Sequence, residues 1–318
     1  MINTITLNPA IDSLLFIDSF RKNVTARIRE RAEALGGKGA HISVNLALMG
    51  EPNQAFGMLF GETGKKIESM VSRTGAVSKF IYGEGGEGRE SRTNFVVIED
   101  SGDSTIIAEQ GVLLSEPEIR SVIKSLLDGS EEGDSFVFSG DASNVSDPYI
   151  YNRFIEEVRG KAGKIFVDAS GLALRKAIEA SPFLIKPNRD ELEDATGVVI
   201  KNDEDAVRAI RSLDRYEIKN IALTLGGEGA MVRFEDGSIL RADAPEVTVR
   251  NTTGCGDAFL SGLILGFSRG LGHETMLHLA AAMSAATAAS PLSVGFDKNY
   301  AESLIEKVEV KTISRCPS

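Results

Sequence analysis

Short and long apolar segments alternate along the second half of the chain. The short segments, such as 135–139 and 164–168, are rich in aromatic and β-branched residues, which is typical of buried strands. The longer segments, such as 116–127, repeat apolar residues at the spacing of one helix face. Helices are expected at 116–127, 147–159, 172–180, 189–196, 204–213, 258–269, 274–289 and 300–307, and strands at 135–139, 164–168, 183–186 and 220–225. Repeated βα units of this kind predict a mostly parallel sheet with helices on both faces.

The first third of the chain has a different pattern. A strand is expected at 2–7, and 12–33 alternates apolar and polar positions unevenly, as in partly exposed extended structure. Residues 93–99 and 104–108 have the pattern of a hairpin. Because neither stretch contains a helix, the two together predict a small sheet that projects from the main layers. The other expected elements are helices from 39 to 50 and at 63–73, a strand at 55–60, and short strands at 230–234, 238–241 and 246–249.

Composition and charge narrow the range of partners. The chain has 318 residues, a formal net charge of −11 and no basic run, so nucleic acid is not an expected partner. No segment is apolar enough to span a bilayer and the N-terminus has no leader pattern, so we expect no membrane association and a cytoplasmic location. The two cysteines, Cys255 and Cys316, fit a reducing compartment. The simplest organisation is a single domain over 1–318, whose projecting sheet is built from segments at approximately 12–33 and 89–109.

The candidate chemistry centres on residues 251–257, which read Asn-Thr-Thr-Gly-Cys-Gly-Asp and lead directly into an apolar helix. The first N–H groups of a helix have no internal partner, so together with the helix dipole they can form an anion site. A carboxylate at this place, Asp257, suits phosphoryl transfer, in which it would take a proton from the attacking hydroxyl. Asp257 could instead cap the helix, and the motif on its own favours that interpretation.

Three further motifs are candidates for ligand binding or for an ordinary structural role. The Gly-Gly-Lys-Gly sequence at 36–39 opens a helix without the spacing of a Walker A loop, and either holds a ligand against its backbone or simply connects a strand to a helix. The glycine-rich run at 225–230 follows a strand and on its own favours a turn. Asn188 and Glu191 lie three residues apart at a helix start, where they could form a capping box or position a hydrated Mg²⁺.

Four single residues are weighed in the same way. Arg27 and Arg92 fall in the two segments of the projecting sheet, where they are either solvated or bind a phosphate. His41 follows the second glycine-rich motif, and a lone histidine is more often packed than catalytic. Cys255 has no evident paired base, so it is expected to be a small apolar filler.

Taken in order, the motifs resemble those of the PfkB-type carbohydrate kinases of the ribokinase-like superfamily. The resembling segments are 6–12, 36–39, 91–94, 167–171, 186–191 and 251–257, which together span nearly the whole chain. The first two are most similar to the branch that contains the 1-phosphofructokinases and tagatose-6-phosphate kinases. The resemblance implies an α/β fold, namely a ribokinase-like αβα sandwich with a mostly parallel central sheet and a small β-sheet lid. It also implies a kinase that uses ATP and Mg²⁺, acts on a ketohexose phosphate with fructose 1-phosphate preferred, and dimerises through the lid.

The resemblance further implies a role for each matching position. Asp257 is the implied catalytic base, beside the phosphoryl-binding N–H groups of Gly254, Cys255 and Gly256. The substrate is implied to contact Asp12, Arg27, Gly37, Lys38, Gly39, His41, Arg92 and Ser139. The nucleotide is implied to contact Lys186, Asn188, Thr224, Gly226, Gly227 and Gly229, with Mg²⁺ held through water near Asn188 and Glu191.

The sequence departs from the family pattern at several positions. His41 stands where the branch usually has a sugar-binding asparagine, and Thr25 where relatives can have a phosphate-contacting lysine. Ser139 is followed by Gly-Asp-Ala-Ser-Asn rather than the usual serine-leucine-proline-proline run, and Cys255 replaces an alanine. These changes leave the catalytic loop intact, but they mean that the substrate can differ from that of the branch. The alternatives are tagatose 6-phosphate, an unphosphorylated sugar, polyol or nucleoside, or a non-catalytic sugar-phosphate-binding protein, for which a catalytic carboxylate would have no use.

Overall fold

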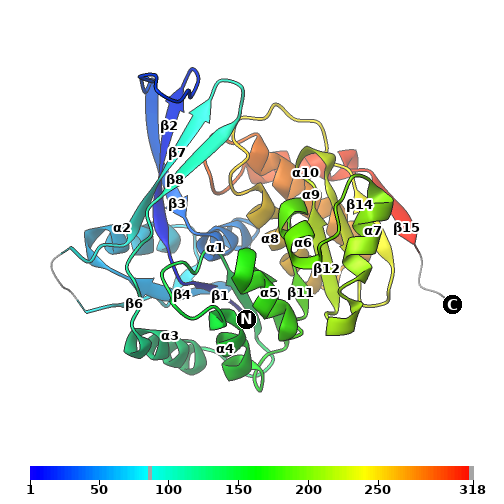
Figure 1. Cartoon of the computed structure of the whole chain (residues 1–318), viewed down its shortest axis with the longest axis horizontal. Helices are drawn as coiled ribbons and strands as arrows, with labels where there is room; N and C mark the ends of the chain where they lie inside the picture. The colour runs from blue at the N-terminus through cyan, green and yellow to red at the C-terminus, as the bar shows by residue number, and fades with distance from the viewer. Residues whose placement is uncertain (85–87, 315–318) are drawn as a thin grey trace.

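The structure, a computed structural model, describes residues 1–84 and 88–314, so Cys316 lies outside the described residues. Within them the largest element is an eleven-stranded sheet in the order β15-β14-β13-β12-β11-β10-β9-β1-β4-β5, with β6 also paired to β4 (Figure 1). The strands are β1 (Ile2–Thr6), β4 (Asn53–Leu59), β5 (Val77–Ser78), β6 (Ile81–Tyr82), β9 (Ser135–Ser139), β10 (Lys164–Asp168), β11 (Leu184–Ile185), β12 (Asn220–Thr224), β13 (Ala230–Arg233), β14 (Ile239–Ala242) and β15 (Val310–Ser314). The sheet is parallel from β5 to β12 and antiparallel from β12 to β15.

Helices cover both faces of this sheet because its strands are apolar on both sides. Phe136 and Phe138 of β9 pack among α3 to α7, whereas Val137 packs among α1, α8, α9 and α10 on the other side. The helices are α1 (Lys38–Leu48), α2 (Gly61–Ser72), α3 (Glu116–Gly129), α4 (Ile150–Val158), α5 (Gly171–Glu179), α6 (Arg189–Thr196), α7 (Asp203–Arg211), α8 (Cys255–Ser268), α9 (His273–Ala288) and α10 (Lys298–Leu304). The predicted αβα sandwich with a mostly parallel sheet is therefore confirmed.

A second, four-stranded sheet in the order β3-β2-β7-β8 projects from the sandwich, and is called the lid below (Figure 1). Its strands are β2 (Ala10–Ile17), β3 (Glu30–Gly36), β7 (Arg92–Glu99) and β8 (Ser104–Ala108). Leu14, Val96 and Ile98 form its buried face. The hairpin of β7 and β8 contacts the sandwich, since Ser104 Oγ lies 3.5 Å from Thr253 Oγ1. Because β2 follows β1 after three residues, the lid begins at the carboxyl end of a central strand.

The short strands β5 and β6 were not expected, and two features of the C-terminal third also differ from the pattern-based expectations. Residues 246–249 alternate like a strand, but they form no strand and lie in the connection between β14 and α8. Strand β15 is not predicted by its short and largely exposed sequence, and it forms by pairing with the edge of β14. The helices of the described part of the chain include none with the length and apolar character needed to cross a bilayer.

Candidate active site

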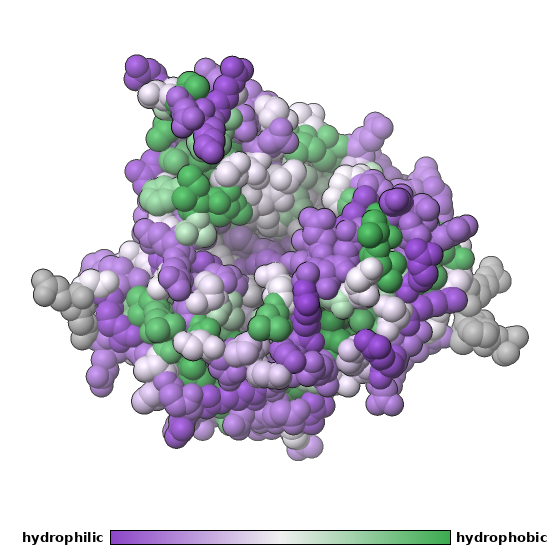
Figure 2. Space-filling model, viewed as in Figure 1, coloured by the Kyte–Doolittle hydropathy of each residue, from purple (hydrophilic) through white to green (hydrophobic). Residues whose placement is uncertain are grey.

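A cavity of about 930 Å³ opens between the lid and the carboxyl ends of the parallel strands. Figure 2 shows the surface hollowed between the lid and the C-terminal helices. Open α/β sheets bind their ligands at this edge. Most of the predicted site residues line the cavity: Asp12, Gly37, Lys38, His41, Arg92, Lys186, Asn188, Glu191, Thr224, Gly226, Gly227, Gly229, Gly254, Cys255, Gly256 and Asp257.

Glycine shapes the loop that precedes α8. Gly254 is the N-cap of this helix with φ 84°, and a Cβ there would lie 2.0 Å from the carbonyl oxygen of Ser293, so a side chain is excluded. A Cβ on Gly256 would lie 3.3 Å from Lys186 Nζ, which puts that ammonium group beside the helix N-terminus. The N–H groups at the helix start, the helix dipole and Lys186 together form a corner suited to an anion.

A buried carboxylate holds two lysines at this anion corner. Asp168, at the end of β10, has Oδ1 3.0 Å from Lys38 Nζ and Oδ2 3.2 Å from Lys186 Nζ. Burial raises the pKa of Asp168, but the charges of the two lysines lower it by more. The pKa of this carboxyl is therefore below its ordinary value. Loss of water contact lowers the pKa of Lys38, whereas the nearby carboxylates, Asp168 above all, produce a net increase. Two lysines around one carboxylate leave a net positive charge facing the cavity.

The carboxylate of Asp257 is paired with a histidine from the other half of the chain. Asp257 Oδ2 lies 2.6 Å from His41 Nδ1, and His41 Nε2 lies 2.8 Å from the carbonyl oxygen of Leu35. Both side chains are nearly fully buried. Among the described residues Oδ1 of Asp257 accepts no hydrogen bond, and no backbone N–H of α8 is capped by this side chain. The interpretation of Asp257 as a helix cap is therefore wrong.

The lid supplies the opposite wall of the cavity. Asp12 Oδ1 accepts a hydrogen bond of 2.9 Å from Asn94 Nδ2, which joins β2 to β7. Arg92 is nearly buried and donates to the carbonyl oxygens of Asn8 and Glu109. The lid thus presents a fixed carboxylate and a fixed guanidinium group to the cavity.

The charge of Arg92 is already paired. Arg92 Nη1 lies 2.8 Å from Asp141 Oδ2, and Asp141 also accepts hydrogen bonds from the backbone and hydroxyl of Ser143. Burial raises the pKa of Asp141, but the bonds from Ser143 and the charge of Arg92 bring it below the ordinary value. An anion that approached Arg92 would therefore also meet a carboxylate.

Asn188 and Glu191 form a capping box at the start of α6. Asn188 Oδ1 accepts from the backbone N–H of Glu191, and Glu191 Oε2 accepts from that of Asn188, both at 2.8 Å. Both residues also line the cavity. The remaining oxygen of Glu191 accepts no bond from the described residues, so a hydrated Mg²⁺, which needs few protein ligands, fits this donor set.

Small residues form the wall of the cavity beyond β12. Thr224, Gly226, Gly227 and Gly229, the residues implied to contact a nucleotide, lie at the end of this strand and line the cavity. The facing wall was not predicted: it comes from 244–247, from Val249 and from a stripe on α9 made of Ala281, Ser284, Ala285 and Ala288. The signal in the sequence was the recurrence of small residues at helical spacing, which ordinary helix packing produces equally well.

Three predicted contacts do not line the cavity. Arg27 is exposed in the connection between β2 and β3. Gly39 is buried, and a Cβ there would lie 2.5 Å from Thr6 Oγ1 and 2.6 Å from the carbonyl oxygen of Ile5. Ser139 is fully buried at the end of β9, and its hydroxyl has no partner in the described residues. Conversely, the side chains of Asp141, Asn94 and Asp168 contribute without having been predicted.

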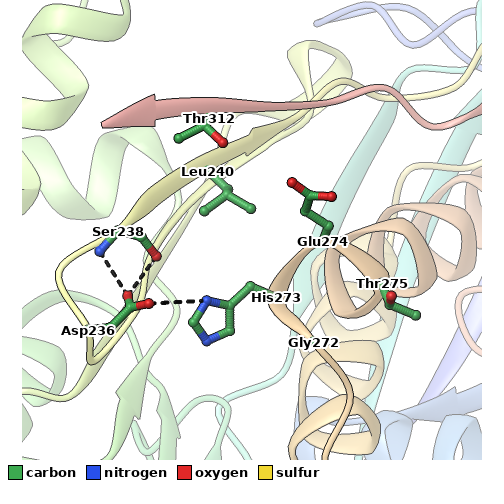
Figure 3. Close-up of a pocket in the computed structure, with 8 residues that line it drawn as sticks. All are labelled: Asp236, Ser238, Leu240, Gly272, His273, Glu274, Thr275 and Thr312. Carbon is green, nitrogen blue, oxygen red and sulfur yellow. Dashed lines mark hydrogen bonds and ion pairs between the residues drawn. The ribbon is translucent and has the colours of Figure 1, made fainter. Parts of the chain in front are cut away.

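A second hollow of about 570 Å³ lies on the surface between β14, β15 and the start of α9 (Figure 3). The His273 ring points toward Asp236, with Nδ1 3.7 Å from Oδ2, and stacks on Phe234. Ser238 donates to the same carboxylate. These contacts join α9 to the turn between β13 and β14, and none of the predicted site residues lies there.

The main cavity combines a carboxylate, one oxygen of which accepts no hydrogen bond from the described residues, with a corner suited to an anion, as a phosphotransferase acting on a hydroxyl group requires. Comparison with known proteins identifies the family of phosphotransferases. The chain belongs to the pfkB family of carbohydrate kinases, whose family model matches residues 5–295. It is therefore a kinase that acts on a sugar hydroxyl, and sugar kinases of this family use ATP.

Individual relatives agree with this assignment. The chain is 28% identical to 1-phosphofructokinase of Bacillus subtilis (strain 168), over 98% of this chain and 99% of that protein. It is 27% identical to tagatose-6-phosphate kinase of Staphylococcus epidermidis (strain ATCC 12228), over 98% and 99%. The structure of phosphofructokinase-2 from Escherichia coli in complex with potassium has the same fold, with a TM-score of 0.86 at 21% identity over 96% of this chain and 98% of the other.

Proposed function

We propose that this protein transfers the γ-phosphoryl group of ATP to a hydroxyl of a ketohexose phosphate, with fructose 1-phosphate the first candidate. The observation that carries the proposal is the position of Asp257, in the first turn of α8 and facing a cavity with the anion corner on one side and the lid on the other. The names of the similar curated proteins support a phosphorylated ketose as the acceptor.

The proposed reaction needs few groups. The acceptor oxygen forms a bond to the γ-phosphorus as the bond between that phosphorus and the oxygen of the leaving ADP breaks, and the hydroxyl proton passes to Asp257. The N–H groups of Gly254, Cys255 and Gly256, with Lys186 and Lys38, would balance the charge of the transferred group. Because this transition state is loose, the base acts late, and orientation matters more than basicity.

The nucleotide would lie against the small-residue wall. Thr224 and the glycines at 226, 227 and 229 leave room for phosphates, and the α9 stripe offers small, mostly apolar side chains to the adenine ring. Asn188 and Glu191 would hold a hydrated Mg²⁺ that neutralises phosphate charge. The capping box already orients both side chains toward one another, which supports a site that is formed before the ligand binds.

A second acceptor class is favoured by a specific observation. The ion pair between Arg92 and Asp141 is nearly neutral, and hydroxyl groups could hydrogen-bond to both members. A phosphate in contact with Arg92 would be repelled by Asp141, and Arg27 does not line the cavity to compensate. An unphosphorylated sugar or polyol is therefore the alternative acceptor.

The central test is Asp257→Asn. We expect turnover to fall by ~10²–10⁴, or about 3–5.5 kcal/mol of barrier, while ATP binding measured by calorimetry is nearly kept. The wild type should be assayed for ADP release over a panel of phosphorylated and free ketoses and polyols. Retention of more than a tenth of the turnover in the variant would refute the role of Asp257, and ADP release with free acceptors alone would refute the phosphosugar.

We also propose a homodimer through the lid. Phe95 and Ile107 are paired across β7 and β8 on the face opposite Asn94, which lines the cavity, and their exposed fractions are 36% and 52%. Apolar side chains at this exposure support a partner surface. Sedimentation analysis should give a dimer for the wild type and a monomer for Phe95→Asp with Ile107→Lys. A wild-type monomer at high protein concentration would contradict the proposal.

A further inference from the structure

The histidine that faces the candidate base has a hydrogen-bond partner on each ring nitrogen. Nε2 of His41 lies 2.8 Å from the carbonyl oxygen of Leu35, which can only accept, so Nε2 carries a hydrogen. Nδ1 lies 2.6 Å from Asp257 Oδ2, the short distance of a charge-assisted hydrogen bond. The ring is almost fully buried, so water does not compete for either partner.

The charges around the ring favour its cationic form. Asp257 faces it from α8 and Asp12 from β2, with Asp12 Oδ2 3.9 Å from Nε2, while β3 contributes the carbonyl of Leu35. Burial lowers the pKa of His41, but the bond to Asp257, the two carboxylate charges and the carbonyl together raise it above its ordinary value. A cation between two carboxylates also reduces the repulsion that these would otherwise exert on a phosphoryl group.

We propose that His41 is a positioning residue for the phosphoryl transfer: as an imidazolium anchored on Leu35, it holds Oδ2 of Asp257 and leaves Oδ1 to accept the proton of the acceptor hydroxyl. This inference rests on the proposed role of Asp257 as the base. An imidazolium with hydrogen on both nitrogens cannot accept another proton, so His41 acts through Asp257 and not as a second base.

Loss of the Nδ1 proton would reverse the interaction. A neutral ring that keeps its Nε2 hydrogen for Leu35 points the Nδ1 lone pair at Asp257 Oδ2, and two acceptors at 2.6 Å repel one another. The carboxylate would then rotate or remain buried without its partner. Activity should therefore be present below the pKa of His41 and fall as the pH rises through it.

Two isosteric substitutions separate the two hydrogen bonds. The amide nitrogen of asparagine occupies the position of Nδ1, so His41→Asn can keep the bond to Asp257 and lose the bond to Leu35. The amide nitrogen of glutamine occupies the position of Nε2, so His41→Gln does the reverse. We expect both variants to lower kcat, and His41→Gln to lower it 10- to 100-fold more than His41→Asn, with KM for ATP unchanged in both.

The pH profile gives a readout that a structural role would not change. The alkaline fall in kcat should be present in the wild type and absent in His41→Asn, which cannot ionise. Equal loss of kcat in the two variants, at equal melting temperatures, would refute the positioning role. An alkaline fall that persists unchanged in His41→Asn would refute it as well.

A measurement on the unliganded protein separates this inference from the proposed function. In ¹⁵N NMR at neutral pH, both ring nitrogens of His41 should show the shifts of a protonated imidazolium, and Asp257→Asn should shift the titration of His41 to lower pH. A non-protonated Nδ1 at neutral pH refutes the inference, even if Asp257 proves to be the base. Loss of activity in Asp257→Asn tests the base itself, whatever the NMR result.

Discussion

Removing the charge of Asp141 tests whether a phosphate lies beside Arg92. Asp141→Asn keeps the size of the side chain and removes only the charge. An anion bound to Arg92 would lie on the order of 4 Å from Asp141, because both would contact one guanidinium group. Two unit charges at that distance repel by ~1 kcal/mol in water and ~4 kcal/mol near a protein surface. The Asp141 side chain is 41% exposed, so the lower part of this range, about 1–2 kcal/mol, is appropriate.

The assay compares fructose 1-phosphate with fructose as acceptors at saturating ATP. A gain of about 1–2 kcal/mol predicts that the ratio of kcat/KM for the phosphorylated over the free sugar rises ~5- to 30-fold in Asp141→Asn. Asp18→Asn removes the same charge from an exposed lid position that does not line the cavity, and serves as the matched control. An unchanged kcat/KM for fructose 1-phosphate would refute the phosphate position. A ratio that rises only because kcat/KM for the free sugar falls would favour the unphosphorylated acceptor.

Further predictions concern the glycine loop and the metal. Gly256→Ala adds a methyl 3.3 Å from Lys186 Nζ, so kcat should fall about tenfold with little loss of melting temperature, as measured by steady-state kinetics and calorimetry. Gly254→Ala forces a contact of 2.0 Å with a carbonyl oxygen at φ 84°, and should destabilise the fold by about 2–4 kcal/mol in urea unfolding; equal effects of the two variants would contradict this distinction. Glu191→Gln keeps a capping-box side chain but removes its charge, and should raise the Mg²⁺ concentration for half-maximal rate, whereas an unchanged Mg²⁺ dependence would leave only the capping role.

The layers and the glycine-rich loops could be predicted because their signals are local. Apolar periodicity locates helices and strands, and glycines before a helix indicate an anion site, so the motifs at 251–257 and 225–230 stand out in the sequence, and residues of both line the cavity. The motif at 251–257 alone favours a helix cap for Asp257, and the role of base comes from the resemblance to the family. The partners of these groups could not be predicted. Asp141 lies 49 residues from Arg92, and no periodicity relates the two. The substrate contact expected for Ser139 is not seen, because this residue follows Phe138 at the end of a strand that is buried on both faces. In such a strand the sequence does not show which face of the sheet a given side chain occupies.

The pairing of His41 with Asp257 also has a consequence for folding. The two residues are 216 positions apart, and β2 must pair with β7 across a separation of 82 before the lid exists. Contacts between residues this far apart in the sequence form slowly and late in folding. During synthesis, β1, the lid and most of the sandwich leave the ribosome before α8 does, so a nascent chain would lack Asp257, the proposed base, until most of the sequence is present. In refolding, the return of kinase activity therefore reports the last long-range step, whereas far-ultraviolet circular dichroism reports the earlier formation of helices and sheet.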